Sequence, residues 1–341
     1  MPGWITGLLL AGWVVASCLE LAATEPRNVT PRAGEGAYAL LRRHGFEPTP
    51  EDFEAFRQLN QNRLGANDAL IRGRTYRIPD PRQAAARKPV AGGRVYYPIF
   101  GPRYAWVERK DTELADCALY LESGHGGPDP GALGWRDGHL LAEDEYAYDI
   151  TLRLARVLLE HGAAVFLIVR DPNDGIRDGQ WLVPDHDELT YPRQPVPANQ
   201  VRRLHQRAAA VNALYAQERG RHRYHRLVIV HVDSRSQDEK IDTFFYHHAN
   251  SAAGRRLAAN LRDAFEENYR KHQPERGYHG SVSARDLYML RATVPPAAFI
   301  ELGNIRNPNN QYRFIDPANR QALAEWIAAG IVRDVRAERD R

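Results

Sequence analysis

Residues 123–132 have the sequence SGHGGPDPGA and directly follow an apolar run, ALYL at residues 118–121. The run predicts a buried strand, and the glycines predict a turn in which the backbone can approach a ligand closely. Binding sites in open α/β sheets form beyond the carboxyl ends of the strands. We therefore expect the imidazole of His125 to be exposed at the rim of a sheet. The alternative is a glycine-rich turn in which the histidine has no function. Other residues able to bind a ligand at the same edge of the sheet would favour a binding site.

Strands and helices alternate along the rest of the chain, which predicts an α/β layer structure. The predicted strands are residues 117–122, 164–169, 227–231, 242–247 and 297–302. The predicted helices are residues 143–161, 198–218, 251–271 and 318–337. Before them, apolar residues around Gly101 and Pro102 predict a hairpin at the edge of this α/β domain. We place the whole domain at residues 94–337.

The length of 341 residues allows one large α/β domain and a small one. The formal net charge of +3 is small for this length, so we expect no nucleic-acid partner, which would require a clustered basic face. The sequence has two cysteines, Cys18 and Cys117, which excludes a framework of several disulfides. Cys117 begins the first predicted strand of the domain and is expected to be a core residue.

The first residues carry a targeting signal. Residues 4–17 are apolar and uncharged, with the length of a secretory h-region, and are too short for a membrane span. We expect residues 1–23 to be a signal peptide or lipoprotein signal, and the protein to be exported to the periplasm or cell envelope. Cys18 ends a sequence, VASC, that resembles a bacterial lipobox and would make this residue the lipid anchor. No Lys or Arg precedes the stretch, so cleavage near Ala22 and Ala23 or an uncleaved anchor stays open.

Residues 28–79 have the size of a small separate module. Periodicity predicts a short helix that ends at Gly45, a second helix at residues 50–59 and a strand at residues 75–78. The segment resembles a lysin-motif (LysM) domain, a β-α-α-β module that binds glycan chains. A generic pair of helices packed on the main domain is the alternative. Residues 80–93 lack periodicity and carry Pro, Ala and Gly, which predicts a linker.

Two further residues supply candidate ligands near His125. Glu143 lies in the first turn of a predicted helix, one turn before Tyr146 on the apolar face. The helix dipole alone could explain an acid at this place, which is the structural alternative. His231 ends the apolar run at residues 227–230, so two strands end in histidines at what should be one edge. Two histidines and a carboxylate are a ligand set of catalytic zinc, which leaves a fourth position for water.

Glu301 places a carboxylate within an apolar strand. Charged residues are almost never fully buried unless they are paired. Next to a zinc-bound water, Glu301 could act as the general base and then pass the proton to a leaving nitrogen. A structural ion pair with an arginine is the alternative.

Several blocks together resemble the catalytic domain of zinc-dependent N-acetylmuramoyl-L-alanine amidases, bacterial enzymes that detach the stem peptide from muramic acid in peptidoglycan. The matching residues are ESGHGG at 122–127, DPGA at 129–132, Glu143, Arg207, Asn212, His231 and PAAFIELG at 296–303. Glu143 is found by counting back from residues 158–162, so its neighbours Asp144 and Glu145 stay open as the ligand. The departures are Glu122, Ser123, Val232-Asp233 after the second histidine, and Arg306.

The resemblance implies one zinc ion held by His125, Glu143 and His231, with Glu301 as the catalytic acid/base. It implies a twisted, mostly parallel or mixed sheet with helices on both faces. The implied partners are peptidoglycan glycan strands and stem peptides. Some family members carry a helix that plugs the active site until a protein activator moves it, so a protein activator stays open as a partner of this chain.

In this chain that region, residues 171–199, contains Pro172, Pro184, Pro192, Pro195 and Pro197, which argues against a long helix. A surface loop and a lid over the cleft are the two interpretations. Two other functions stay open for the chain. One is a catalytically silent wall-binding or regulatory protein, and the other is a zinc peptidase that cuts peptide bonds.

Overall fold

The computed structural model describes residues 27–32, 35–44, 50–65, 70–78, 94–233 and 242–340. The chain forms two compact units, residues 1–87 and residues 88–341. The expected signal at residues 1–23, the candidate anchor Cys18 and the expected linker at residues 80–93 lie outside the described residues. In the described part of the chain, no helix has the length and apolar character needed to span a bilayer.

The N-terminal unit has the element order strand, helix, helix, strand. Its elements are β1 (Arg27–Val29), α1 (Ala37–Arg43), α2 (Pro50–Leu59) and β2 (Tyr76–Ile78), and β1 pairs with β2 antiparallel. Both predicted helices and the predicted strand are therefore present. The buried side chain of Asn60 joins the end of α2 to β2, because its amide donates to the carbonyl of Arg77 at 2.7 Å and its oxygen accepts the Arg77 amide at 2.8 Å.

The second unit is built on a six-stranded sheet with the order β14-β13-β15-β12-β5-β8. Its strands are β5 (Cys117–Ser123), β8 (Ala164–Leu167), β12 (Tyr224–Asp233), β13 (Phe244–His247), β14 (Ser281–Ala284) and β15 (Ala297–Asn304). Neighbours pair in parallel except β13 and β15, which are antiparallel. The predicted α/β fold with a mostly parallel, mixed sheet is confirmed. Cys117 is buried in β5, as expected, and burial raises the pKa of its thiol to about 12.

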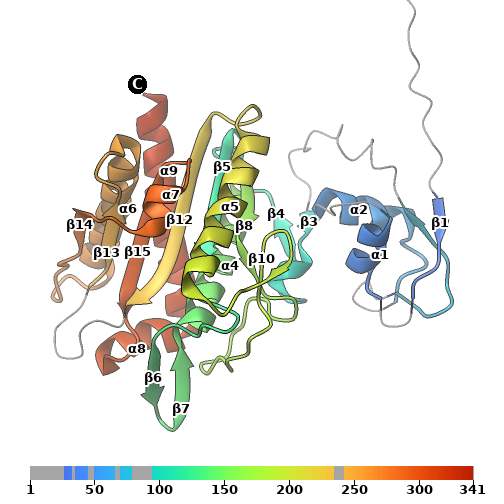
Figure 1. Ribbon diagram of the computed structural model, residues 1–341, viewed down its shortest axis with the longest axis horizontal. Helices are drawn as coiled ribbons and strands as arrows, with labels where there is room; N and C mark the ends of the chain where they lie inside the picture. The colour runs from blue at the N-terminus through green and yellow to red at the C-terminus, as the bar shows by residue number, and fades with distance from the viewer. Residues whose placement is uncertain are drawn as a thin grey trace, which may run out of the picture. The chain divides into compact units, whose positions relative to one another are not determined.

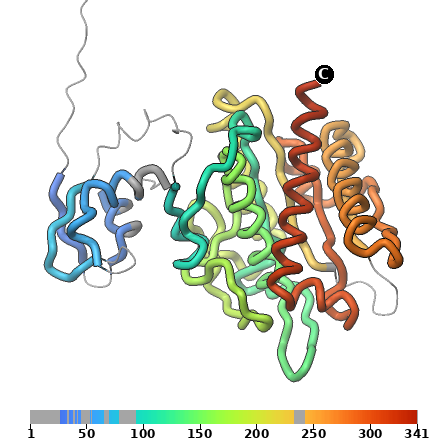
Figure 2. Tube along the Cα trace, turned by 180° about the vertical axis from the view of Figure 1, so that it is seen from behind, coloured from blue at the N-terminus to red at the C-terminus, as the bar shows by residue number. Residues whose placement is uncertain are grey.

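Helices cover both faces of this sheet (Figure 1). The helices α4 (Glu143–Glu160), α6 (Ala252–His272) and α9 (Pro317–Arg339) share one core cluster, and α6 and α9 lie nearest the viewer in Figure 2. On the other face lie α5 (Gln200–Glu218) and α7 (Tyr288–Ala292). Alternate residues of β5 divide between the two cores, Leu119 and Leu121 on one side and Ala118 and Tyr120 on the other. A strand buried on both faces explains the continuous apolar runs in the sequence.

The helix α4 is buried on nearly every side, and not only along the predicted apolar face that contains Tyr146. The side chain of Asp149 accepts hydrogen bonds from Arg153 at 2.7 Å, Arg320 at 2.6 Å and the amide of Arg177 at 2.8 Å. This buried ion cluster joins α4 to α9 and to the segment after β9. Removing one partner of such a pair leaves an uncompensated buried charge, at a cost of about 3–5 kcal/mol.

Two hairpins flank the sheet. The predicted one is β3 (Arg94–Tyr96) with β4 (Trp106–Glu108), and a 3₁₀ turn at Pro98–Phe100 lies between them. The other, β6 (Leu133–Arg136) with β7 (His139–Ala142), was not predicted from the sequence, and it projects from the unit in Figures 1 and 2. The strand β14 and the helix α8 (Pro308–Ile315) were not predicted either.

The segment at residues 171–199 contains no helix, as its prolines predicted. Two short strands, β10 (Leu189–Thr190) and β11 (Gln194–Pro195), form a three-stranded sheet with β9 (Val169–Arg170). The predicted strand at 164–169 is therefore divided between β8 and β9. The dividing residue, Ile168, donates to the carbonyl of Leu121 and accepts from the amide of Tyr191, so it joins the two sheets.

Candidate metal centre

His125 lies in the turn that follows β5, in a left-handed backbone conformation. Its φ is 65°, and Gly126 and Gly127 have φ values of 105° and 64°. Left-handed backbone suits glycine and is rare for other residues, which makes His125 a strained position of the kind found at functional sites. The guanidinium of Arg207 donates to the carbonyl of His125 and pairs with Glu122 at 3.0 Å. Arg207 therefore fixes the backbone of this turn. The side chain of His125 is 26% exposed, so it is partly buried and not fully open at the rim of the sheet as expected.

His231 and Glu301 lie side by side on neighbouring parallel strands. The register of β12 and β15 pairs His231 with Glu301. Side chains alternate between the faces of a strand, so these two share the face on which Phe299 lies. The imidazole of His231 stacks on the Phe299 ring with centroids 4.4 Å apart. The sheet itself therefore sets the position of both side chains.

Glu143 connects the two histidines. One of its carboxylate oxygens lies 3.3 Å from Nε2 of His125, and the other lies 3.1 Å from Nδ1 of His231. The amides of Ala132 and Val232 donate to the same two oxygens at 2.9 Å and 2.8 Å. Because Glu143 opens α4 and is buried, these hydrogen bonds fix its carboxylate in one orientation.

The three side chains can hold a metal ion together. Each offers a ligand atom, and these atoms lie within 4.8 Å of one another. Two imidazole nitrogens and one carboxylate oxygen are a donor set that suits zinc. Behind this set, Nδ1 of His125 lies 3.0 Å from Asp129, whose carboxylate also pairs with Arg203 at 2.6 Å. Such outer partners orient a metal-binding imidazole and fix its tautomer.

Charges within the cluster shift the pKa values of its members. Burial lowers the pKa of His125, but the hydrogen bond to Asp129 and the charge of Glu143 outweigh it and leave this pKa raised. Burial dominates at His231 and lowers its pKa, although Glu143 acts in the opposite direction. At Glu143 burial acts to raise the pKa, but the two histidines and the amide of Ala132 outweigh it, so the pKa is lowered. The carboxylate is thus held in the ionised form that a metal ligand needs.

Of the three neighbouring acids at the start of α4, the structure brings Glu143 to the histidines. Asp144 and Glu145 lie in a different cluster with Glu188. Burial, reinforced by the charges of Glu145 and Glu188, raises the pKa of Asp144 to about 9. Of the three acids left open by the sequence, Glu143 is therefore the one that lies beside His125 and His231.

A cavity of about 380 Å³ opens at this cluster. Its lining residues are His125, Asp129, Gly131, Ala132, Glu143, His231, Arg285, Leu287, Phe299, Glu301 and Arg306. Glu301 thus lies in the same cavity as the three candidate ligands. None of these lining residues comes from the segment at 171–199, although Glu188 of that segment accepts the amide of Gly127 at 2.6 Å.

Sequence reasoning gave no role to Asp129, Arg203 or Arg285. Asp129 stands four residues after His125 in the DPGA block, and this spacing was the available signal for a partner of His125. Arg203 and Arg285 follow from the packing of distant segments and have no such signal. Asn212, noted in the sequence, lies away from the cavity lining and joins α5 to the loop before β15, since its side chain bonds to Ala292 and Val294.

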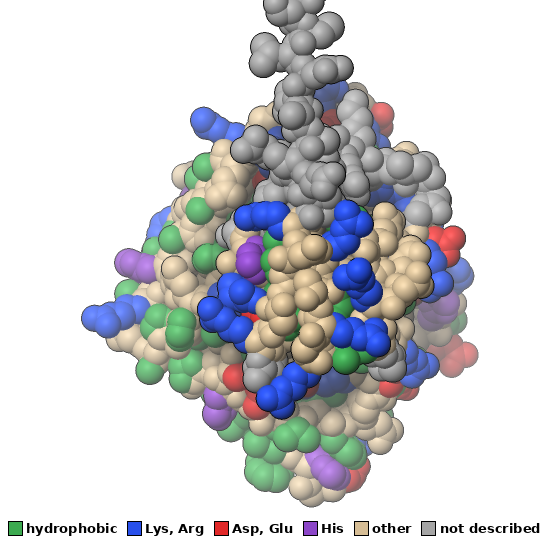
Figure 3. All heavy atoms as spheres, turned by 90° about the vertical axis from the view of Figure 1, so that its right-hand side faces the viewer, with side chains coloured by type: hydrophobic (Ala, Val, Ile, Leu, Met, Phe, Trp, Pro, Cys, Tyr) green, Lys and Arg blue, Asp and Glu red, His purple; other side chains and the backbone are tan. Residues whose placement is uncertain are grey.

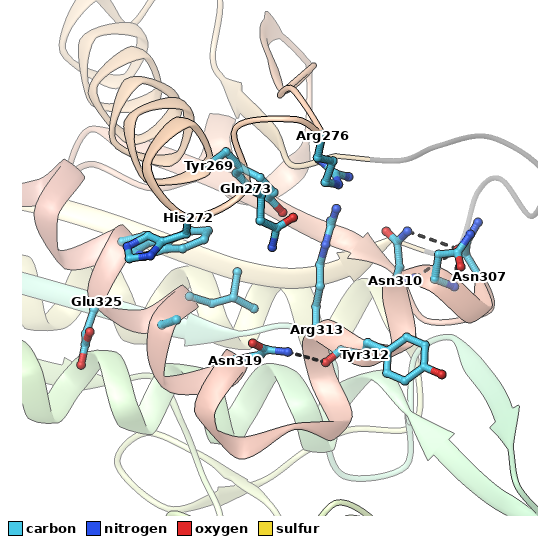
Figure 4. Close-up of a pocket in the computed structure, with 14 residues that line it drawn as sticks. Tyr269, His272, Gln273, Arg276, Asn307, Asn310, Tyr312, Arg313, Asn319 and Glu325 are labelled. Carbon is cyan, nitrogen blue, oxygen red and sulfur yellow. Dashed lines mark hydrogen bonds between the residues drawn. The ribbon is translucent and has the colours of Figure 1, made fainter.

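A larger cavity, of about 840 Å³, lies between the end of α6, the helix α8 and the start of α9 (Figure 4). Tyr269 and Arg276 lie on one side of it, and Arg313, Tyr312 and Asn319 lie on the other. None of the candidate ligands lines this cavity. The candidate ligands and Glu301 line the smaller cavity, which we therefore take as the candidate site.

Comparison with known proteins shows the family to which the chain belongs. The sequence profile of the N-acetylmuramoyl-L-alanine amidase family matches residues 119–333, which include all four candidate residues. The chain belongs to this amidase family. The sequence is similar to that of the germination-specific N-acetylmuramoyl-L-alanine amidase of Bacillus subtilis (strain 168), with 23% identity over 220 residues, which are 64% of this chain and 80% of the relative.

Solved amidase structures are also similar to this family member. The CwlD amidase from Clostridioides difficile, solved in complex with the GerS lipoprotein, has 18% identity and a TM-score of 0.47, over 64% of this chain and 98% of that one. The amidase Ami1 from Mycobacterium smegmatis has 18% identity and a TM-score of 0.47, over 66% of this chain and 99% of that one. The family resemblance inferred from the sequence is confirmed by the family match.

Gly124 tests whether the position of His231 controls metal binding in this amidase-family site. A Cβ at Gly124 would overlap the imidazole ring of His231, which Glu143 and Phe299 hold in place. We expect Gly124→Ala to weaken binding of zinc by about 10- to 100-fold, measured by competition with a chromophoric chelator. Gly220→Ala is the control, because a Cβ there meets no atom within 4 Å. Equal zinc affinity in the two variants would refute this role of His231.

Proposed function

We propose that this protein is a zinc-dependent N-acetylmuramoyl-L-alanine amidase that hydrolyses the amide bond between N-acetylmuramic acid and L-alanine in peptidoglycan. Membership of the family supports the reaction class. The observation that carries the proposal is the Glu143 carboxylate between two imidazoles, with Glu301 in the same cavity. In this proposal His125, Glu143 and His231 hold the zinc ion, and Glu301 is the catalytic acid/base.

The residues divide the chemistry between them. Zinc, when bound, supplies a Lewis acid that polarises a carbonyl and acidifies water. The carboxylate of Glu301 accepts a proton from the attacking water and then protonates the L-alanine nitrogen as it leaves. Glu301 can do this reproducibly because β15 is held between β12 and β13, which fixes its backbone next to His231. Arg285 and Arg306 also line the cavity, beside three carboxylates, and each offers a positive charge to an anionic stem peptide.

Substitution of Glu301 tests its role. We expect Glu301→Gln to lower the release of stem peptides from purified sacculi by about 10²- to 10⁴-fold, because it removes the proton carrier without removing a ligand. Zinc content, measured by mass spectrometry of the metal, should stay at one ion per chain. Glu267→Gln is the control, since Glu267 lies on the exposed side of α6 and pairs with Arg333 at 2.6 Å.

Three outcomes separate this proposal from its alternatives. Near wild-type turnover of Glu301→Gln, or loss of zinc from it, would contradict the assigned role. A wild-type protein that binds sacculi and releases nothing would indicate the silent wall-binding protein. Products cut within the stem peptide, identified by mass, would indicate a zinc peptidase. The departure at Val232-Asp233 gives no support to the silent protein, because Val232 still donates its amide to Glu143.

We further propose that the N-terminal unit is a LysM-like module that binds peptidoglycan glycan strands. Its order of strand, helix, helix and strand supports this. Its exposed cationic side chains are Arg27, Arg32, Arg43, Arg63, Arg72, Arg74 and Arg77. Lys and Arg side chains are prominent on the molecular face drawn in Figure 3.

Deletion of the N-terminal unit tests this second role. We expect a chain that begins at Lys88 to bind sacculi at least about tenfold more weakly than the full-length chain in a sedimentation assay, because a linked binding module raises the effective concentration of the enzyme at the wall. Its turnover of soluble muropeptides should equal that of the full-length chain. Equal sedimentation of both chains would refute the glycan-binding role.

The proposed substrate lies outside the cytoplasm, so we also propose export to the periplasm or cell envelope through residues 1–23. Mass spectrometry of the mature N-terminus distinguishes a lipidated Cys18 from cleavage near Ala22 and Ala23 and from an uncleaved anchor. The need for a protein activator stays open, and the turnover of the purified chain alone would test it.

A further inference from the structure

A second cluster of acidic side chains lies between the start of α4 and the segment at residues 171–188. Asp144, Glu145 and Glu188 each offer an oxygen within 4.8 Å of the others. Asp171, Asp185 and Glu188 do the same. Glu188 belongs to both sets, so two groups of three carboxylates from two distant parts of the chain adjoin one another. None of the five is a candidate ligand of the His125 centre.

These carboxylates are buried with little positive charge to balance them. Asp144, Glu145, Asp171 and Glu188 are at most 4% exposed. Glu145 pairs with Arg177 at 2.8 Å. In the part of the chain that the structure describes, no arginine, lysine or histidine forms an ion pair with the other three, Asp144, Asp171 and Glu188. Buried charges are normally paired with an opposite charge or bound to a metal ion.

Asp144 supplies an independent sign of a missing partner. Its Oδ1 accepts the amide of the adjacent Glu145 at 2.9 Å. Its Oδ2 is buried and has no hydrogen-bond partner among the described residues. The charges that act on it are those of Glu145, Glu188 and Glu143, all of them carboxylates. A buried carboxylate oxygen without any donor is expensive to maintain, and a bound cation would satisfy it.

We propose that this cluster is a calcium site, in which Asp144, Glu145 and Glu188 are the ligands and Asp171 and Asp185, which adjoin Glu188, add negative charge around the ion. An all-oxygen, anionic set selects a hard cation and not zinc. Calcium binds oxygens at about 2.3–2.6 Å, so two ligands on opposite sides of the ion lie about 5 Å apart, which matches the spacing of this cluster. Magnesium retains several waters and commonly takes one or two carboxylates, so it fits a buried group of carboxylates less well.

The proposed ion would tie the proline-rich segment to the neighbourhood of the His125 centre. Asp144 follows Glu143 directly in α4, and successive helix residues point in different directions, which separates the two sites. On the other side, Glu188 accepts the amide of Gly127, two residues after His125. The amide of Asp185 also donates to Glu145 at 3.0 Å. Calcium at this place would therefore stabilise the 171–188 segment against α4.

Calcium binding is measured on the purified full-length protein, stripped of calcium on a chelating resin and reloaded with one equivalent of zinc. We expect calorimetric titration with calcium chloride to show one ion bound per chain, with no release of zinc. The melting temperature should rise by about 5–10 °C at a hundredfold excess of calcium over its Kd. Absence of binding and of a shift at millimolar calcium would overturn the proposal, as would tighter binding of magnesium.

Variants locate the site. Asp144→Asn should weaken calcium binding about tenfold or more, because affinity depends on the number of charged ligands. Without calcium, its melting temperature should stay close to that of the wild type, since the amide of asparagine has the same size and shape as the carboxyl group. Asp185→Asn should also weaken calcium binding. Because Asp185 is partly exposed, this second variant tests the site with less risk of a folding defect than Asp144→Asn. Glu267→Gln should bind calcium like the wild type.

One further variant separates this site from the proposed zinc centre. His125→Ala should lose zinc and keep its calcium affinity. Loss of both ions together would show that calcium occupies the histidine centre, and unchanged affinity in Asp144→Asn would equally overturn the assignment. These readouts do not use turnover, so they stand whether or not the protein is an active amidase.

Discussion

The carboxylate of Glu143 lies between the imidazoles of His125 and His231, with one oxygen towards each ring. Three separate parts of the fold meet at this carboxylate, namely the turn after β5, the end of β12 and the first turn of α4. Two backbone amides hold it, and hydrogen bonds to a charged group contribute about 1.5–3 kcal/mol each. The geometry of the proposed zinc centre depends on this one side chain, because its carboxylate contacts both imidazoles.

Buried charge is also the constraint on the rest of α4. Asp149 binds three arginine groups at the middle of the helix, while Glu143 meets two imidazoles at its start. Asp144, between them in sequence, has no cation of its own among the described residues, and it is there that we place calcium. The three acids of this helix thus have different partners: imidazoles at Glu143, arginines at Asp149 and, in our proposal, calcium at Asp144. The same helix packs on the sheet that positions His231 and Glu301, so fold and site are stabilised together.

Much of this arrangement could be predicted from the sequence. Apolar runs located β5, β12 and β15, and the rule that parallel strands end at one edge predicted that His125, His231 and Glu301 lie close together. The buried polar side of α4 could not be predicted, because its partners Arg177 and Arg320 lie far away in sequence. The hairpin β6–β7 and the edge strand β14 were missed because each strand has only four residues, and so short a segment shows no clear apolar pattern. The choice of Glu143 over Asp144 needed the actual start of the helix, which periodicity gives only within a residue or two.

Anomalous X-ray diffraction at the zinc absorption edge, from crystals of the zinc-loaded protein, tests the central claim most directly. The account predicts one strong peak, about 2.0–2.2 Å from a nitrogen of His125, a nitrogen of His231 and an oxygen of Glu143, with Glu301 facing the remaining coordination position. A fully occupied zinc peak on other residues, with these three side chains unliganded, would contradict it.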